Sequence, residues 1–120
     1  MISANDVLHI ISEMHQFTTL LLELKDTTVI GIAQHPSGKL SYFKCSSTLT
    51  APERSLLAKQ ICDGEMPGNA HPLAVEDLLT EIEGKRARHI WLESVGRKRT
   101  ELGFLSISEL KAYFRSHPQR

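Results

Sequence analysis

The sequence predicts a single compact α+β domain over residues 1–120, in which two β-hairpins pack with about four helices. Two observations predict this class. Apolar residues recur at helical spacing in four segments, and turn-forming residues separate strand-like segments in two places. A chain of 120 residues supports one hydrophobic core but not two. We therefore expect one domain without an internal linker.

The composition is that of an ordinary globular protein, with 41% hydrophobic and 23% charged residues. No apolar stretch approaches the roughly 18 residues that cross a bilayer, and no basic and apolar leader follows Met1. We expect a cytoplasmic protein that does not associate with membranes. Cys45 and Cys62 lack C-x-x-C spacing, so we interpret both as reduced core thiols.

The first third of the chain predicts a helix and a hairpin. Ser3 and Asp6 resemble a capping box, and the apolar spacing that follows predicts a helix from residue 4 to about residue 16 or beyond. Residues 17–24 are rich in Thr and Leu and either extend this helix or begin a strand. Residues 29–32 and 40–45 flank a turn with Pro and Gly, which indicates a β-hairpin.

Two helices are predicted in the middle of the chain. Thr50 and Glu53 form a second capping box, with a proline in the first turn of a helix over residues 51–62. Residues 63–71 read as a loop, after which Pro72 opens a helix to residue 83. The apolar positions i, i+3, i+4 and i+7 of this helix are Val75, Leu78, Leu79 and Ile82.

The last third predicts a second hairpin and a final helix. Residues 89–95 and 101–105 are strand-like and flank Gly96, which is followed by three basic residues at the tip. Ser106 and Glu109 form a third capping box ahead of an apolar helical face.

Charge is distributed unevenly around the second hairpin. Residues 61–83 contain six acidic residues and no Lys or Arg, whereas residues 85–99 contain six basic residues and one acidic residue, a net charge of +5. Trp91 lies among these cations. Its indole either belongs to the core, stacks on a base or anchors a protein interface. The predicted binding residues are Lys85, Arg86, Arg88, Trp91, Arg97, Lys98 and Arg99.

Two resemblances suggest a partner class. Residues 51–105 resemble a winged helix-turn-helix, which implies a wing whose basic tip contacts phosphates. The helix in the recognition position departs from that pattern, because it carries only acidic polar side chains toward solvent and none that reads base edges. Residues 66–93 also resemble the helix and tryptophan-bearing strand of one group of bacterial immunity proteins, which implies a protein partner.

The sequence indicates binding rather than catalysis. It has no phosphate-binding loop, zinc-protease or hydrolase motif, and its histidines lack the spacing of metal ligands. We predict no catalytic, cofactor or metal site. The expected function is that of a small non-enzymatic regulatory protein of the immunity, antitoxin or adaptor type, acting through protein–protein contacts. The alternative is a nucleic-acid-binding accessory protein whose basic hairpin contacts phosphates.

Overall fold

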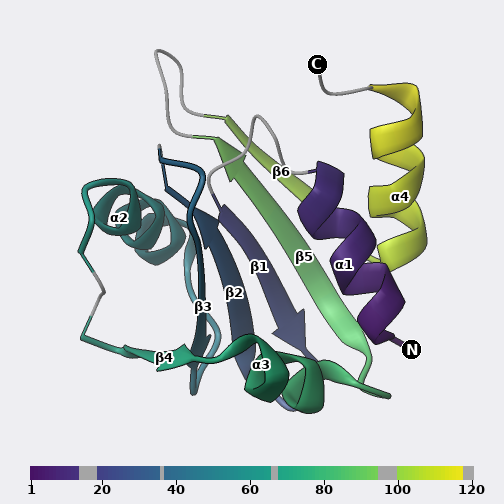
Figure 1. The fold of residues 1–120 in the computed structure, drawn as a ribbon, viewed down its shortest axis with the longest axis horizontal. Helices are drawn as coiled ribbons and strands as arrows, with labels where there is room; N and C mark the ends of the chain where they lie inside the picture. Colours follow the sequence, from purple (N-terminus) through teal and green to yellow (C-terminus); the bar gives the residue numbers. More distant parts are fainter. Residues whose placement is uncertain (14–18, 36, 66–67, 95–99, 118–120) are drawn as a thin grey trace.

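The computed structural model of the protein describes residues 1–13, 19–35, 37–65, 68–94 and 100–117, with the backbone alone at residues 62 and 100. Its strands are β1 (Thr19–Leu24), β2 (Val29–Gln34), β3 (Leu40–Cys45), β4 (Ala70–Leu73), β5 (Ala87–Ser94) and β6 (Thr100–Phe104). Its helices are α1 (Ala4–Glu13), α2 (Ala51–Cys62), α3 (Val75–Ile82) and α4 (Ile107–Ser116). The strands form one antiparallel sheet in the order β4-β3-β2-β1-β5-β6 (Figure 1). The predicted α+β class is confirmed.

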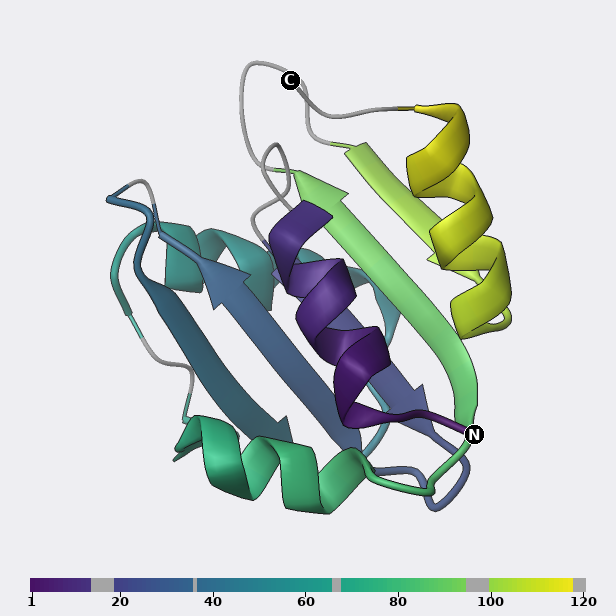
Figure 2. The same cartoon turned by 45° about the vertical axis from the view of Figure 1, so that its right-hand side comes forward.

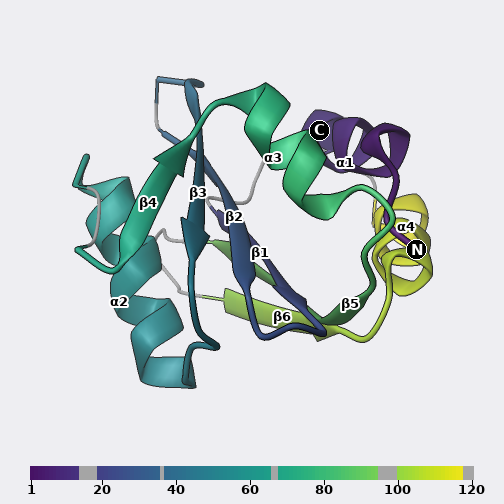
Figure 3. The same cartoon turned by 90° about the horizontal axis from the view of Figure 1, so that it is seen from below.

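The sheet is the middle layer of three. Helices α1, α3 and α4 pack on one face and α2 on the other (Figure 3). Helices α1 and α4 lie side by side, with α4 against β5 and β6 (Figure 2). Side chains of β1 alternate between the layers, since Leu20 and Leu22 join the core under α1, α3 and α4 while Leu21 joins the core under α2. Both faces of β1 are therefore buried, which explains its unbroken apolar sequence.

Two of the three predicted capping boxes form both reciprocal bonds, and the third forms one, because the Glu109 side chain accepts from the Leu105 N–H and not from the Ser106 N–H. Thr50 Oγ1 accepts the Glu53 N–H at 3.4 Å, and Glu53 Oε1 accepts the Thr50 N–H at 2.9 Å. Ser106 Oγ accepts the Glu109 N–H at 3.2 Å. Ser3 Oγ accepts the Asp6 N–H, and Asp6 Oδ2 accepts the Ser3 N–H. These pairs satisfy backbone donors that a helix start leaves without intrahelical partners.

The residues around Pro72 correct the prediction. Pro72 lies in β4, and α3 begins only at Val75. A proline is tolerated there because β4 is an edge strand, where a missing N–H costs no bond to a second neighbour. Strand β4 also carries the chain from one face of the sheet to the other, so α2 and α3 pack in different layers.

Both predicted hairpins are present, as β2–β3 and β5–β6, but they belong to one sheet. A third hairpin, β1–β2, settles residues 19–24 as strand. Its turn holds Thr27 at a φ of 70°, and Asp26 Oδ1 accepts the Thr28 N–H at 3.0 Å. Among the described residues, no helix has the length and apolar character needed to cross a membrane.

Candidate functional site

The predicted binding residues do not form one patch in the described part of the chain. Lys85 and Arg86 lie in the connection from α3 to β5, and Arg88 is exposed where the β1–β5 register skips a residue. Trp91 lies midway along β5. The cations Arg97, Lys98 and Arg99 fall outside the described residues. Because β5 has eight residues and a strand rises about 3.3 Å per residue, the two ends of β5 lie about 23 Å apart.

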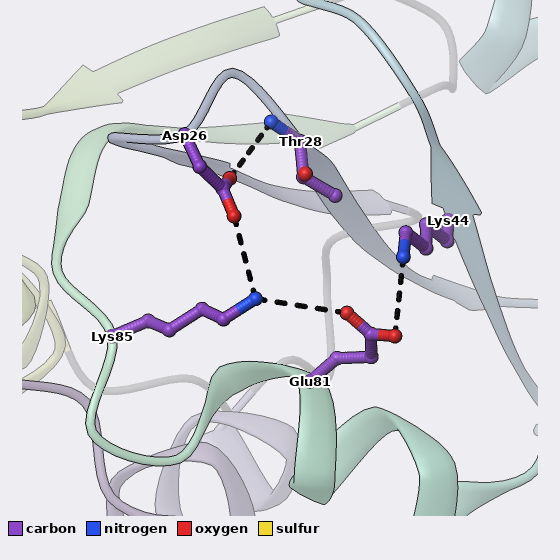
Figure 4. A network of polar contacts seen from close by, with 5 residues as sticks. All are labelled: Asp26, Thr28, Lys44, Glu81 and Lys85. Carbon is purple, nitrogen blue, oxygen red and sulfur yellow. Dashed lines mark hydrogen bonds and ion pairs between the residues drawn. The ribbon is translucent and has the colours of Figure 1, made fainter.

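Lys85 belongs to an ion-pair network that holds α3 against the sheet (Figure 4). Its Nζ lies 3.4 Å from Asp26 Oδ2 and 3.8 Å from Glu81 Oε2. Glu81 also binds Lys44 Nζ of β3 at 3.1 Å, so it links the helix to β3 and to the α3–β5 connection instead of lying on a solvated helix face. Hydrogen bonds from the backbone and side chain of Thr28, together with Lys85, hold the pKa of Asp26 below its usual value. Lys85 therefore serves the fold.

Trp91 lies on the α2 side of the sheet between two nitrogen-bearing groups. Its ring stacks on His89, with centroids 4.0 Å apart and planes at 10°. The Arg54 guanidinium carbon, from the first turn of α2, lies 3.7 Å from the Trp91 ring centroid. A Cβ at Gly103 would come within 2.7 Å of the Trp91 ring, so only glycine lets the indole lie across β6.

Arg54 joins α2 to β6 through a bidentate ion pair. Its Nε and a terminal nitrogen donate to the two carboxylate oxygens of Glu101 at 3.0 and 3.1 Å, and its other terminal nitrogen donates to the Leu49 carbonyl at 2.9 Å. Glu101 lies directly opposite the fully buried Glu93 on β5. Glu101 is therefore one of two facing acidic side chains, and the guanidinium binds it directly through charge-assisted hydrogen bonds. We call Arg54, His89, Trp91, Glu93 and Glu101 the Arg54 cluster.

The Arg54 cluster is closed to small molecules. The space that Arg54 and Trp91 enclose with Leu21, Val29 and Leu49 has no room for a water molecule. The indole Nε1 of Trp91 is buried there without a hydrogen-bond partner in the described part of the chain. The cluster contains acids and a histidine, but it offers no substrate cavity. The contacts of the cluster hold the β5–β6 hairpin against α2 instead.

Sequence reasoning assigned no role to Arg54 or Glu101, which are 47 residues apart. One signal was present: an arginine in the first turn of a helix is unfavourable for the helix dipole and therefore needs another partner. Among the described residues, no group of three or more His, Cys, Asp or Glu side chains is arranged to hold a metal ion.

Strand β6 presents an open edge. It ends the sheet, so one row of its backbone groups has no strand neighbour in the described structure. Its one charged side chain, Glu101, is bound to Arg54, and it contains no proline. The opposite edge strand, β4, is shorter and contains Pro72. Leu105, which follows β6, is 64% exposed. Open edges of this kind accept further strands.

Cys45 agrees with its expected structural role. It is a free thiol buried beneath α2, and burial raises its pKa, which suppresses the reactive thiolate. The side chain of Cys62 lies outside the described residues. His35, expected in a solvated turn, is half-buried, and its Nε2 lies 2.7 Å from Ser41 Oγ.

No protein-family model matches the chain, and neither curated proteins nor solved structures give a match. Three features of the structure bear on function: the Arg54 cluster, the open edge of β6 and the exposed cations at the start of β5.

Proposed function

We propose that the chain is a small, non-enzymatic, cytoplasmic binding protein of the immunity, antitoxin or adaptor type that engages a protein partner through the β5–β6 hairpin. The observation that carries this proposal is the open edge of β6. An extended segment of a partner adds to such an edge through main-chain hydrogen bonds, while neighbouring side chains supply specificity. No comparable edge exists at β4, because Pro72 removes a donor there.

The Arg54 cluster supports this proposal by holding β6 rigid. The bidentate bond of Arg54 ties β6 to α2, and Gly103 packs under the Trp91 ring. An edge that is already ordered does not pay the conformational entropy that a mobile segment loses on binding. Half-buried Trp91 and exposed Leu105 flank the edge with apolar surface, and tryptophan is enriched at the centres of protein interfaces.

Photocrosslinking in cells of the source organism tests the proposal. A photoreactive phenylalanine analogue at Leu105, which is 64% exposed beside β6, should give a discrete covalent adduct with another protein. The matched control is the same analogue at Leu56, which is 57% exposed on α2. A purified complex should also show slowed amide exchange at residues 100–105. Equal labelling from both positions, or no adduct from Leu105, would refute the proposal.

A second candidate function is nucleic-acid binding, favoured by Arg86 and Arg88. Both side chains are exposed, and neither forms an ion pair with a described residue. They would contact phosphates without reading sequence, which makes binding strongly salt-dependent. Fluorescence anisotropy with generic duplex and single-stranded DNA and RNA at several salt concentrations tests this. Changing Arg97, Lys98 and Arg99 together to Ala should flatten the salt dependence, and absence of binding at low salt contradicts this function.

A further inference from the structure

Two hollows lie at the end of the sheet where β5 begins, and both are lined by Lys25 and Arg86. The larger has a volume of about 340 Å³ and the smaller about 310 Å³. The larger is bounded by α1, the start of β5 and the first turn of α4. Its further lining residues include Ile2, Asp6, Ala87, Ser106, Ile107 and Lys111.

Backbone bonds hold the walls of the larger cavity in place. The Lys25 N–H donates to the Arg86 carbonyl at 3.2 Å, which fixes these two residues beside each other. Ile2 donates to the Lys85 carbonyl at 2.8 Å and accepts from the Gly84 N–H at 3.1 Å, so the segment before α1 runs along the connection to β5. The cavity is thus built from four segments that are distant in sequence.

The charges around the cavity leave cations in excess. Lys25 and Arg86 form no ion pair with any described residue. The two nearby carboxylates are already engaged, since Asp26 binds Lys85, and Asp6 binds Lys111. The linings of the two hollows together hold Lys25, Lys85, Arg86 and Lys111 against Asp6 and Asp26, which is four minus two, or +2.

We propose that the larger cavity binds a small organic phosphate, with its phosphate group between Lys25 and Arg86, the two lining cations that form no ion pair with a described residue. A planar guanidinium donates two parallel hydrogen bonds to a phosphate, and an ammonium group serves as a compact point charge. The Ser106 and Ser108 hydroxyls line the same cavity and supply neutral donors.

The volume of the cavity and the apolar part of its lining favour an organic ligand over the free ion. About 340 Å³ lies in the range of small-molecule sites, and a lone phosphate ion would fill only a fraction of it. Ile2, Ala87 and Ile107 supply the smaller, apolar part of a mainly polar lining, and the rest of the ligand packs against this part. None of the lining residues of this cavity belongs to β6, so the two proposals are tested at different residues.

The test is an NMR amide titration of the full chain with phenyl phosphate, inorganic phosphate and phenol. Phenyl phosphate should give saturable shifts at Lys25, Arg86 and Ser108, and it should bind more tightly than either of the other two. Arg86→Gln should weaken binding about ten-fold or more, because it removes a charged phosphate donor. The matched control is Arg88→Gln, which makes the same charge change at an exposed residue two positions further along the chain that lines neither hollow. Lys25→Gln provides a second weakened variant.

Three outcomes would overturn the assignment. Absence of saturable shifts rules out the site. Equal affinity for inorganic phosphate and phenyl phosphate rules out an organic ligand. Equal weakening of phenyl phosphate binding in Arg86→Gln and Arg88→Gln shows diffuse attraction to a basic surface. If a single-stranded oligonucleotide also binds more tightly than phenyl phosphate and both variants weaken its binding equally, the surface is assigned to nucleic acid instead.

Discussion

Replacing the buried Arg54 with Ala should strongly destabilise the fold. The Arg54 side chain is only 9% exposed, and its three nitrogens donate to Glu101 and to the Leu49 carbonyl. The same guanidinium lies over the Trp91 ring. Truncation at Cβ removes all of these contacts and leaves the Glu101 carboxylate facing Glu93 without the guanidinium between α2 and β6.

The magnitude follows from the degree of burial. Breaking a fully buried ion pair by removing one partner costs roughly 3–5 kcal/mol. Glu101 keeps 21% of its side-chain surface exposed, so water compensates for part of this loss. The lost cation–π contact adds about 1 kcal/mol. We therefore expect Arg54→Ala to lower the free energy of unfolding by about 2–4 kcal/mol, a large part of the roughly 5–15 kcal/mol that stabilises a domain.

Urea unfolding followed by tryptophan fluorescence measures this directly, because Trp91 is the single tryptophan and lies in the cluster. With a slope of about 2 kcal/mol per molar urea, in the middle of the usual range for small domains, the midpoint should fall by roughly 1–2 M. Far-UV circular dichroism of the same samples shows whether the whole domain unfolds in one transition. Arg54→Lys is the conservative control, since it keeps the charge but cannot make the bidentate bond.

A double-mutant cycle separates the ion pair from the loss of packing. Glu101→Gln alone should destabilise the protein, whereas Glu101→Gln added to Arg54→Ala should cost little or restore stability. The coupling energy between the two positions should reach about 1.5–3 kcal/mol. Strictly additive effects, or a loss of less than about 0.5 kcal/mol in Arg54→Ala, would refute the view that this pair anchors β6.

Two further changes test other parts of the structure. Burial acts to raise the pKa of Asp6, but hydrogen bonds with Lys111 and Ser3 outweigh this effect and hold the pKa below 3.8. The stability that ionised Asp6 contributes is therefore present above pH 3.8 and is lost as the pH falls below that value. Asp6→Asn should cost about 1 kcal/mol near neutral pH and progressively less in acid, measured by urea midpoints across pH. Gly31→Ala places a Cβ 2.0 Å from buried Phe43 and should lower the free energy of unfolding by about 1–3 kcal/mol. Adding Phe43→Leu should restore part of this loss. Equal urea midpoints for wild type and Gly31→Ala would contradict this prediction.

Local signals predicted the helices well because capping acts over three residues. In the pairs that begin at Ser3, Thr50 and Ser106, the first side chain accepts the expected backbone N–H. Residues 17–24 remained undecided because the strand they contain is buried on both faces and so lacks the alternation that marks a half-exposed strand. Pro72 was interpreted as a helix start, since a four-residue edge strand carries too few residues to show a period.

The candidate sites were harder to predict because they are assembled from distant segments. The basic segment was treated as one surface, but Lys85 is neutralised by Asp26 and Glu81 at one end of β5. The partner of Trp91 comes from α2, and Lys25 joins Arg86 only because β1 pairs with β5. Spacing along the chain contains no information about such contacts until the strand order is known.

The difference between the two edges of the sheet is the strongest argument that β6 is used for binding. An exposed edge strand invites aggregation, and β4 avoids this by its short length and by Pro72. Strand β6 is one residue longer and contains no proline, and buried Arg54 of α2 holds it in place through Glu101. A polar cluster of this kind is less stabilising than apolar packing of similar volume. Stability alone therefore does not explain it, whereas a fixed edge that accepts a partner strand does.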